Sequence, residues 1–453
     1  MNKHYHLIGI GGIGMSGIAM LLLRQGERVS GSDLKESVIT NELSSLGAMI
    51  FIGHSPDNIK SADVVIYSSA IKEDNPEFQG AKKRKVTLVR RAQALAELMR
   101  DLSVITVAGS HGKTTTSSMA AYLLLEAGLK PSIAVGGIFK NIDTNAYLGE
   151  GNYFVAEADE SDGSFLCYNP DYSIITNIDR EHLDFYLDFE SEIKAFKEFI
   201  YKTKPAGCVF ACADDLNLKN ILKSYTGRNV FFGLNKGPGF YADNIKIEGL
   251  SSAFDCFFQN RFVDRFKLSL GGRHNISNAL AVIALGLELK IGIDVIKAAL
   301  VGYKGAGRRL EEKIKNDRYS VFDDYAHHPT EIKATLSAVK NLSFDRLIAI
   351  FQPHRFSRTQ LLLDEFGGSF EAADIVIITD IYPASEQPIP GITGMRIYDK
   401  IKERSPDKNV VFLAKEDIIE YVLKNIQPRD LIITLGAGDI TGICDELVQR
   451  LKG

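Results

Sequence analysis

The chain has 453 residues and a formal net charge of −4, with 45% hydrophobic and 24% charged residues. This length exceeds what one hydrophobic core supports, and the composition is that of an ordinary globular protein, so a small module and global disorder are both excluded. The slight acidic excess excludes a basic surface for nucleic acid or anionic lipid. Five scattered cysteines without a paired CxxC spacing favour reduced thiols in a cytoplasm over disulfides or a zinc site.

The first segment of interest is the apolar run from Leu7 to Leu23, which superficially resembles a secretory signal. Its glycines, and the absence of a small-residue cleavage site after it, favour a strand, a glycine turn and a helix, so we expect no leader or membrane span. The turn reads Gly9-x-Gly11-x-x-Gly14, and Asp33 ends the next strand. This dinucleotide fingerprint brings a diphosphate to a helix N-terminus but leaves NAD(P) and a nucleotide-sugar both open.

The hydrophobic periodicity predicts an α/β protein of three domains. Strands over 48–52 and 64–68 and a helix over 91–102 complete a Rossmann-like domain, 1–103. A P-loop-type mixed sheet with a hairpin or meander between 231 and 270 forms the central domain, 104–304. Five strands alternating with helices from Tyr319 onward form a second Rossmann-like domain, 305–453.

A second glycine loop joins a strand over 104–108 to a helix over 114–127. Backbone N–H groups of such a loop cradle phosphates, Lys113 would reach the terminal phosphate of ATP, and Thr114 would bind Mg²⁺. The loop is shorter than the usual Walker motif, which needs glycine where this chain has Val107. Its residues are Gly109, Ser110, His111, Gly112, Lys113, Thr114 and Thr115.

Acidic residues follow two central strands. Glu157 begins an acidic run, 157–162, after the strand over 154–156, where a P-loop fold places a carboxylate that completes the Mg²⁺ shell. A second polar run, 177–184, follows the strand over 173–176. Because Mg²⁺ prefers oxygen ligands, the chemistry alone predicts an oxygen donor there and a core or capping role for His182.

Together these motifs resemble the Mur ligase family, the ATP-dependent enzymes that add amino acids to the bacterial peptidoglycan precursor. The match spans the chain and includes the shortened P-loop and the segments 9–17, 31–33, 67–71, 75–77, 323–329 and 352–358. The resemblance implies that the first loop binds a UDP-sugar and that Glu157 and His182 both belong to the metal site. It also implies that two further residues contact the nucleotide and that four contact the amino acid and the reacting phosphate. These implied residues are Gly11, Gly12, Gly14, Asp33, Ser69 and Ala70 for the UDP-sugar, Asn275 and Arg309 for ATP, and Tyr325, His327, Arg355 and Arg358 for the amino acid.

The resemblance further implies addition of the first amino acid, with UDP-N-acetylmuramate and L-alanine as substrates, ATP and Mg²⁺ as cofactors, and a cytoplasmic monomer or homodimer. Lys113, His182, Arg355 and Arg358 would then serve catalysis. The nearest alternative is a recycling ligase that adds a preformed tripeptide. A nicotinamide dehydrogenase would explain only the first glycine loop, and a P-loop switch protein would hydrolyse ATP without an amino acid.

Overall fold

The computed structural model describes residues 2–384 and 386–452. The chain divides into two compact units. The first consists of Met1–Asp243, Asp255–Phe266 and Ser277–Gly305, and the second of Asn244–Phe254, Lys267–Ile276 and Ala306–Gly453. None of the helices in the described ranges is both long and apolar enough to cross a lipid bilayer.

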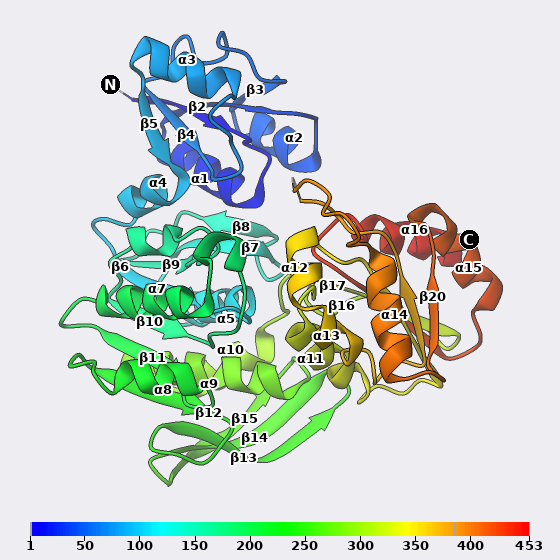
Figure 1. Cartoon of the computed structure of the whole chain (residues 1–453). Coiled ribbons are helices and arrows are strands. Elements are labelled where there is room, and N and C mark those ends of the chain that lie inside the picture. Colours follow the sequence, from blue (N-terminus) through cyan, green and yellow to red (C-terminus); the bar gives the residue numbers. More distant parts are fainter. Residues whose placement is uncertain (1, 385, 453) are drawn as a thin grey trace. The chain divides into compact units, whose positions relative to one another are not determined.

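The first sheet has five parallel strands in the order β3-β2-β1-β4-β5 (Figure 1). The chain order reverses beside β1, so the loops after β1 and β4 meet at one edge, where such sheets bind ligands. The strands are β1 (His4–Ile8), β2 (Arg28–Asp33), β3 (Met49–Ile52), β4 (Val64–Tyr67) and β5 (Thr87–Arg90). The helices are α1 (Ile13–Arg24), α2 (Val38–Ser45), α3 (Pro76–Arg84) and α4 (Arg91–Leu98).

Helix α4 is shorter than the helix that the sequence predicted over 91–102. It ends at Leu98, and the backbone N–H of Leu102 donates to the carbonyl of Met99 in a turn. This turn reverses the chain into β6 (Ser103–Ala108), so the four residues after Leu98 serve the connection.

The central sheet has ten strands in the order β15-β14-β13-β12-β11-β10-β6-β9-β7-β8. It is mixed, because β7 and β8 pair antiparallel while β6, β9, β10 and β11 are parallel. The predicted meander corresponds to β13, β14 and β15, which are successive neighbours. The remaining strands are β7 (Ser132–Phe139), β8 (Thr144–Tyr147), β9 (Tyr153–Glu157), β10 (Tyr172–Ile175), β11 (Cys208–Cys212), β12 (Asn229–Gly233), β13 (Phe240–Glu248), β14 (Ser251–Phe258) and β15 (Arg261–Leu268). The helices are α5 (Lys113–Glu126), α6 (Leu183–Tyr186), α7 (Phe189–Tyr201), α8 (Leu216–Leu222), α9 (Arg273–Glu288) and α10 (Ile293–Gly302), with a 3₁₀ turn η1 (Ser164–Cys167).

The third sheet lies in the second unit and has the order β16-β17-β21-β18-β19-β20. Five of its strands are parallel, as predicted, and β16 adds an antiparallel edge that the sequence analysis did not foresee. The strands are β16 (Glu311–Lys315), β17 (Tyr319–Asp324), β18 (Arg346–Phe351), β19 (Ile375–Ile378), β20 (Asn409–Phe412) and β21 (Asp430–Leu435). The helices are α11 (Pro329–Val339), α12 (Phe356–Leu361), α13 (Leu363–Gly367), α14 (Gly394–Arg404), α15 (Ile418–Asn425) and α16 (Thr441–Lys452), with a 3₁₀ turn η2 (Lys415–Asp417).

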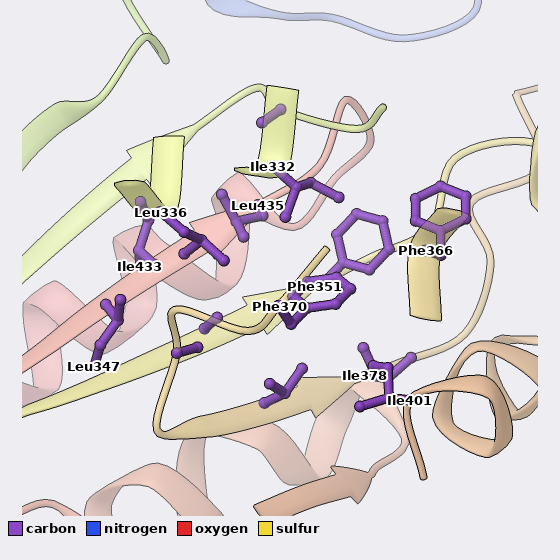
Figure 2. Close-up of a cluster of buried hydrophobic side chains, with 14 of the residues drawn as sticks. Ile332, Leu336, Leu347, Phe351, Phe366, Phe370, Ile378, Ile401, Ile433 and Leu435 are labelled. Carbon is purple, nitrogen blue, oxygen red and sulfur yellow. The ribbon is translucent and has the colours of Figure 1, made fainter. Parts of the chain in front are cut away.

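Hydrophobic clusters cover both faces of the third sheet because its central strands alternate side chains between two helical layers. Figure 2 shows one cluster, in which Phe351 of β18 lies with its ring 5.5 Å from Phe366 and 5.3 Å from Phe370. This packing buries Phe351, the last residue of β18. The segment 352–358 follows it directly in the chain.

Candidate active site

The first glycine loop joins β1 to α1. Its first glycine, Gly9, has φ +75°, a conformation that favours glycine. Asp33, at the end of the neighbouring β2, accepts a hydrogen bond from the Gly11 N–H through Oδ2 at 2.9 Å. A Cβ atom at Gly11 would lie 2.8 Å from this oxygen. The structure thus brings Asp33 onto the predicted diphosphate loop, and it places Ser69 and Ala70 in the exposed turn after β4 at the same sheet edge.

A buried polar network lies beneath this loop. The carboxylate of Glu77, at the start of α3, accepts hydrogen bonds from Ser32 Oγ at 2.5 Å and Asn58 Nδ2 at 2.6 Å, and lies 3.0 Å from His54 Nδ1. Burial alone would raise the pKa of Glu77, but His6, Ser32 and Asn58 outweigh it and lower this pKa to about 2. Glu77 is therefore a buried carboxylate that fixes Ser32, the residue before Asp33.

The second glycine loop lies between β6 and α5, as predicted. Gly109 and Gly112 have φ +130° and +81°. Asn177, which follows β10, closes the loop: its Oδ1 accepts the His111 N–H at 2.8 Å and its carbonyl accepts the Ser110 N–H at 3.1 Å. Sequence reasoning placed Asn177 in the polar run 177–184 but did not assign it to this loop. The signal was its position two residues after β10, a strand that pairs with β6.

Lys113 lies folded back on this loop. Its Nζ donates to the carbonyls of Gly109 (2.7 Å) and Ser110 (3.2 Å) and to Oε1 of Glu160 (2.7 Å). Burial alone would lower the pKa of Lys113, but Glu160, Asp159 and Glu157 raise it, so the ammonium stays charged. Glu160 was not among the predicted site residues, although it lies in the acidic run that the sequence singled out.

The predicted metal ligands contact different neighbours within the first unit. Glu157 accepts a hydrogen bond from the Gly136 N–H of β7 at 2.8 Å. A Cβ atom at the next residue, Gly137, would lie 3.2 Å from Thr114 Cγ2. Glu157 and Thr114 therefore lie beside two adjacent glycines of β7. His182 instead lies with two other acids, its Nε2 3.5 Å from Glu160 and 3.5 Å from Glu181. Ligand atoms of Glu160, Glu181 and His182 lie within 4.8 Å of one another, which fits a divalent cation.

The environment of His182 distinguishes its possible roles. His182 has φ +53° and occupies the N-cap position of α6, but its side chain makes no capping hydrogen bond there. Burial alone would lower the pKa of the imidazole, whereas Glu160 and Glu181 raise it. Nearby Glu192 is fully buried, and burial raises its pKa to about 8. Glu160 and Glu181 beside the ring favour a bound cation over an isolated capping histidine.

In the second unit, the two predicted nucleotide residues have defined partners. Asn275 is buried at the start of α9 and donates through Nδ2 to the Gly271 carbonyl at 2.8 Å. The Arg309 guanidinium lies 4.9 Å from the centre of the Tyr325 ring, and that of Arg308 lies 5.2 Å from it. The structure thus unites Arg309, predicted for ATP, with Tyr325, predicted for the amino acid.

The remaining predicted residues cluster at the carboxyl end of β18. The rings of Tyr325 and His327 lie 5.3 Å apart, and the His327 ring lies 5.7 Å from that of His354. Arg358 is buried and donates to the His354 carbonyl at 3.2 Å. Arg355 has φ +70°, an uncommon conformation for a residue with a side chain, of the kind that clusters at functional sites.

Two residues of this cluster were missed by the sequence analysis. Tyr382 stacks on His354 with ring centres 5.6 Å apart. Glu386 accepts hydrogen bonds from the backbone N–H and the Oγ of Ser357, at 3.0 and 2.5 Å, and lies 3.7 Å from Arg355. Both come from the loop after β19, and no sequence motif marks them, because their partners lie about 30 residues earlier in the chain.

Comparison with known proteins adds independent information. Family models match residues 4–102 (Mur ligase family, catalytic domain), 107–286 (Mur ligase middle domain) and 308–438 (Mur ligase, glutamate ligase domain). The chain is 46% identical over 452 residues, 99% of both chains, to the UDP-N-acetylmuramate–L-alanine ligase of Desulforapulum autotrophicum. It is 45% identical over 449 residues, 99% of this chain and 98% of the other, to that of Geotalea uraniireducens.

Among the solved structures that resemble the whole chain are two ligases. The UDP-N-acetylmuramate–alanine ligase of Thermotoga maritima matches with a TM-score of 0.86 and 29% identity, covering 100% of this chain and 99% of the other. A murein peptide ligase of Psychrobacter arcticus matches with a TM-score of 0.73 and 26% identity, covering 99% of each chain. The first of these likenesses is the greater in both measures.

Proposed function

The chain belongs to the Mur ligase family, and we propose that it is a UDP-N-acetylmuramate:L-alanine ligase, an ATP-dependent enzyme of peptidoglycan precursor synthesis. One observation carries the proposal. The shortened P-loop holds Lys113 among carboxylates at the end of a parallel strand, in a chain 46% identical along its whole length to a relative of that activity.

The chemistry follows from the bond to be made. A carboxylate cannot lose oxide to an amine at neutral pH, so a better leaving group must be made first. An oxygen of the muramyl carboxylate forms a bond to the γ-phosphorus of ATP while the bond from that phosphorus to the bridging oxygen breaks, giving an acyl phosphate and ADP. The amine of L-alanine then attacks the acyl carbon, phosphate leaves, and the amine loses a proton as the amide forms.

Side chains of this chain would supply the charge that phosphoryl transfer requires. Lys113 would exchange the carboxylate of Glu160 for a phosphate of ATP, because both are anionic partners of one buried ammonium. Arg355 and Arg358 would bind the reacting phosphate and the carboxylate of the amino acid, since a guanidinium grips such oxygens at two points. Asn275 and Arg309 would contact the nucleotide, and Tyr325 and His327 the amino acid.

A Mg²⁺ ion fits the donors at the end of the central sheet. Thr114, Glu157 and His182 would hold it, and it would neutralise phosphate charge. Among the described residues, Oε2 of the fully buried Glu160 has no hydrogen-bond partner, which favours a cation close to it. Glu160 and Glu181 are therefore additional candidates for this site.

The first glycine loop would bind the UDP-sugar through Gly11, Gly12, Gly14, Ser69 and Ala70, with Asp33 near the uridine. The enzyme would act in the cytoplasm as a monomer or homodimer, with no nucleic acid or membrane partner. Its domains would be 1–103 for the UDP-sugar, 104–304 for ATP and 305–453 for the amino acid.

The decisive experiment measures ADP release from ATP and UDP-N-acetylmuramate with L-alanine, glycine, L-serine, D-alanine or the muropeptide tripeptide, with the product identified by mass spectrometry. We expect the greatest kcat/KM with L-alanine. The matched control is Lys130→Ala, which removes an exposed lysine whose partner is the exposed Glu150. Selective use of the tripeptide would assign the recycling reaction, and ADP release without any amino acid would contradict a ligase.

A further inference from the structure

Arg91 links the first glycine loop to the acidic run of the central sheet. It is the first residue of α4, and a Cβ atom at Gly14 would collide with its Nη1. Its Nη2 donates to Oδ2 of Asp159 at 3.3 Å. One guanidinium therefore lies against the predicted diphosphate loop through Nη1 and holds Asp159, in the acidic run, through Nη2.

The residue after Asp159 extends this link to the P-loop. Glu160 accepts a hydrogen bond from Lys113, so two consecutive carboxylates hold two cations, Arg91 beside the first glycine loop and Lys113 of the second. The run that carries them is firmly held, because Asp159 Oδ1 accepts the Ser161 N–H at 3.0 Å and the Tyr186 hydroxyl donates to the Glu160 carbonyl at 2.5 Å. Asp159 and Glu160 are joined by one peptide bond, so a displacement of Arg91 that moves Asp159 would also move Glu160 and its partner Lys113.

The charges agree with this arrangement. The Asp159 carboxylate accepts a hydrogen bond from Arg91 and is attracted to the Lys113 ammonium, so it interacts with a cation beside the first glycine loop and with one of the second.

We propose that Arg91 is a positioning residue through which binding of the sugar-nucleotide diphosphate at the first glycine loop and binding of ATP at the P-loop strengthen each other. This inference rests on the proposed function. A diphosphate at Gly11–Gly14 would approach Nη1, which lies against Gly14, while Nη2 keeps Asp159. The diphosphate would act on the Arg91–Asp159 pair, and ATP, by taking the place of Glu160 at Lys113, would act on the same acidic run, so each ligand changes the affinity for the other.

The test is the affinity for a non-hydrolysable ATP analogue, measured by calorimetry with and without saturating UDP-N-acetylmuramate and without amino acid. The coupling factor is the ratio of the two dissociation constants. We expect it to be roughly fivefold or more in the wild type. It should fall to within roughly twofold of one in Arg91→Met and in Asp159→Asn, with Arg91→Lys intermediate because an ammonium cannot bridge two partners in the same plane.

The matched control is Arg90→Met, which removes the same side chain from the adjacent, exposed position. It should keep the wild-type coupling factor. A wild-type factor near one, or an unchanged factor in Arg91→Met, would overturn the inference. If Arg91 only stabilises the fold, Arg91→Met should lower the melting temperature and leave the ratio unchanged; if that variant fails to fold, Asp159→Asn decides the same question.

The two proposals fail in different ways. A wild-type protein that does not bind UDP-N-acetylmuramate contradicts the proposed function. A protein that forms the product with L-alanine, but whose coupling factor does not depend on Arg91 and Asp159, contradicts only this inference.

Discussion

Nζ of Lys113 lies 2.7 Å from Oε1 of Glu160, and both side chains are largely withdrawn from solvent. Glu160 is three residues beyond Glu157, the acid that the sequence predicts for the metal. The ion pair gives the buried P-loop lysine an anionic partner within the chain. A phosphate that took the place of Glu160 would keep the charge of Lys113 compensated.

Lys113→Ala should lose roughly a hundredfold or more in kcat, because a positive charge aimed at the transferring phosphate is worth a few kcal/mol. The variant should also melt at a lower temperature, since it leaves Glu160 buried without its cation. Adding Glu160→Gln to Lys113→Ala should restore part of the melting temperature but none of the activity. Initial rates and melting curves of the two single variants and the double variant check this, and near-normal turnover in Lys113→Ala would contradict the P-loop assignment.

His182→Ala should raise the Mg²⁺ concentration that gives half-maximal rate, as should Glu157→Gln, because each would remove a metal ligand. A purely structural histidine would behave differently: its loss would lower the melting temperature and leave the Mg²⁺ curve unchanged. Titrations of Mg²⁺ against initial rate, beside melting curves without nucleotide, separate the two roles. Glu160→Gln and Glu181→Gln, measured in the same way, show whether the acids that surround His182 also serve the ion.

The buried Glu77 predicts a pH-dependent stability. Its pKa is lowered from 4.5 to about 2 in the fold, so its contribution is fully present above about pH 4.5 and is lost as the pH falls toward 2. The contribution at neutral pH is on the order of 3 kcal/mol. Glu77→Gln should therefore lower the melting temperature at pH 7, and its difference from the wild type should shrink at pH 3. A constant difference across that range would show that the charge of Glu77 does not matter.

Arg358→Lys should lose most of its activity although it keeps the positive charge. The planar guanidinium can bind two oxygens of a carboxylate or phosphate at once, and an ammonium cannot. Arg358 is also buried and held by the His354 carbonyl, so a lysine in its place cannot move to recover the contacts that its shorter side chain loses. Steady-state kinetics for L-alanine and ATP check this, with the exposed Arg396→Lys on α14 as the control. Wild-type kinetics in Arg358→Lys would remove this residue from the site.

Glu386→Gln should raise the KM for L-alanine roughly tenfold and change the KM for ATP less. The Glu386 carboxylate accepts from the Ser357 N–H and Oγ and lies near Arg355, so it holds the start of α12 and the left-handed turn at Arg355. Ser357→Ala, which removes one of these hydrogen bonds, should show a smaller effect in the same direction. Equal changes in both KM values would indicate a general loss of structure instead.

Much of this protein could be derived from its residues in order. Glycines before helices, strands ending in carboxylates and the segments 323–329 and 352–358 predicted three α/β domains, two phosphate-binding loops and the family. These features are local, because a turn that needs φ > 0 and the amphipathic period of a helix both depend on residues that are close in the sequence. The roles of Asp33, Ser69 and Ala70 at the UDP-sugar remain predictions of the same kind.

Other relationships depend on residues far apart in the chain, and only the tertiary structure decided them. Glu160, not Glu157, pairs with Lys113; Arg91 reaches Asp159; Glu386 holds Ser357. Adjacent acids in a run look alike in sequence, and which one faces a buried cation is determined by the twist of the chain after the strand and by the packing of the next helix. The folded backbone limits the directions in which a charged side chain can point. The neighbouring residues in the sequence do not reveal which distant residue will be its partner.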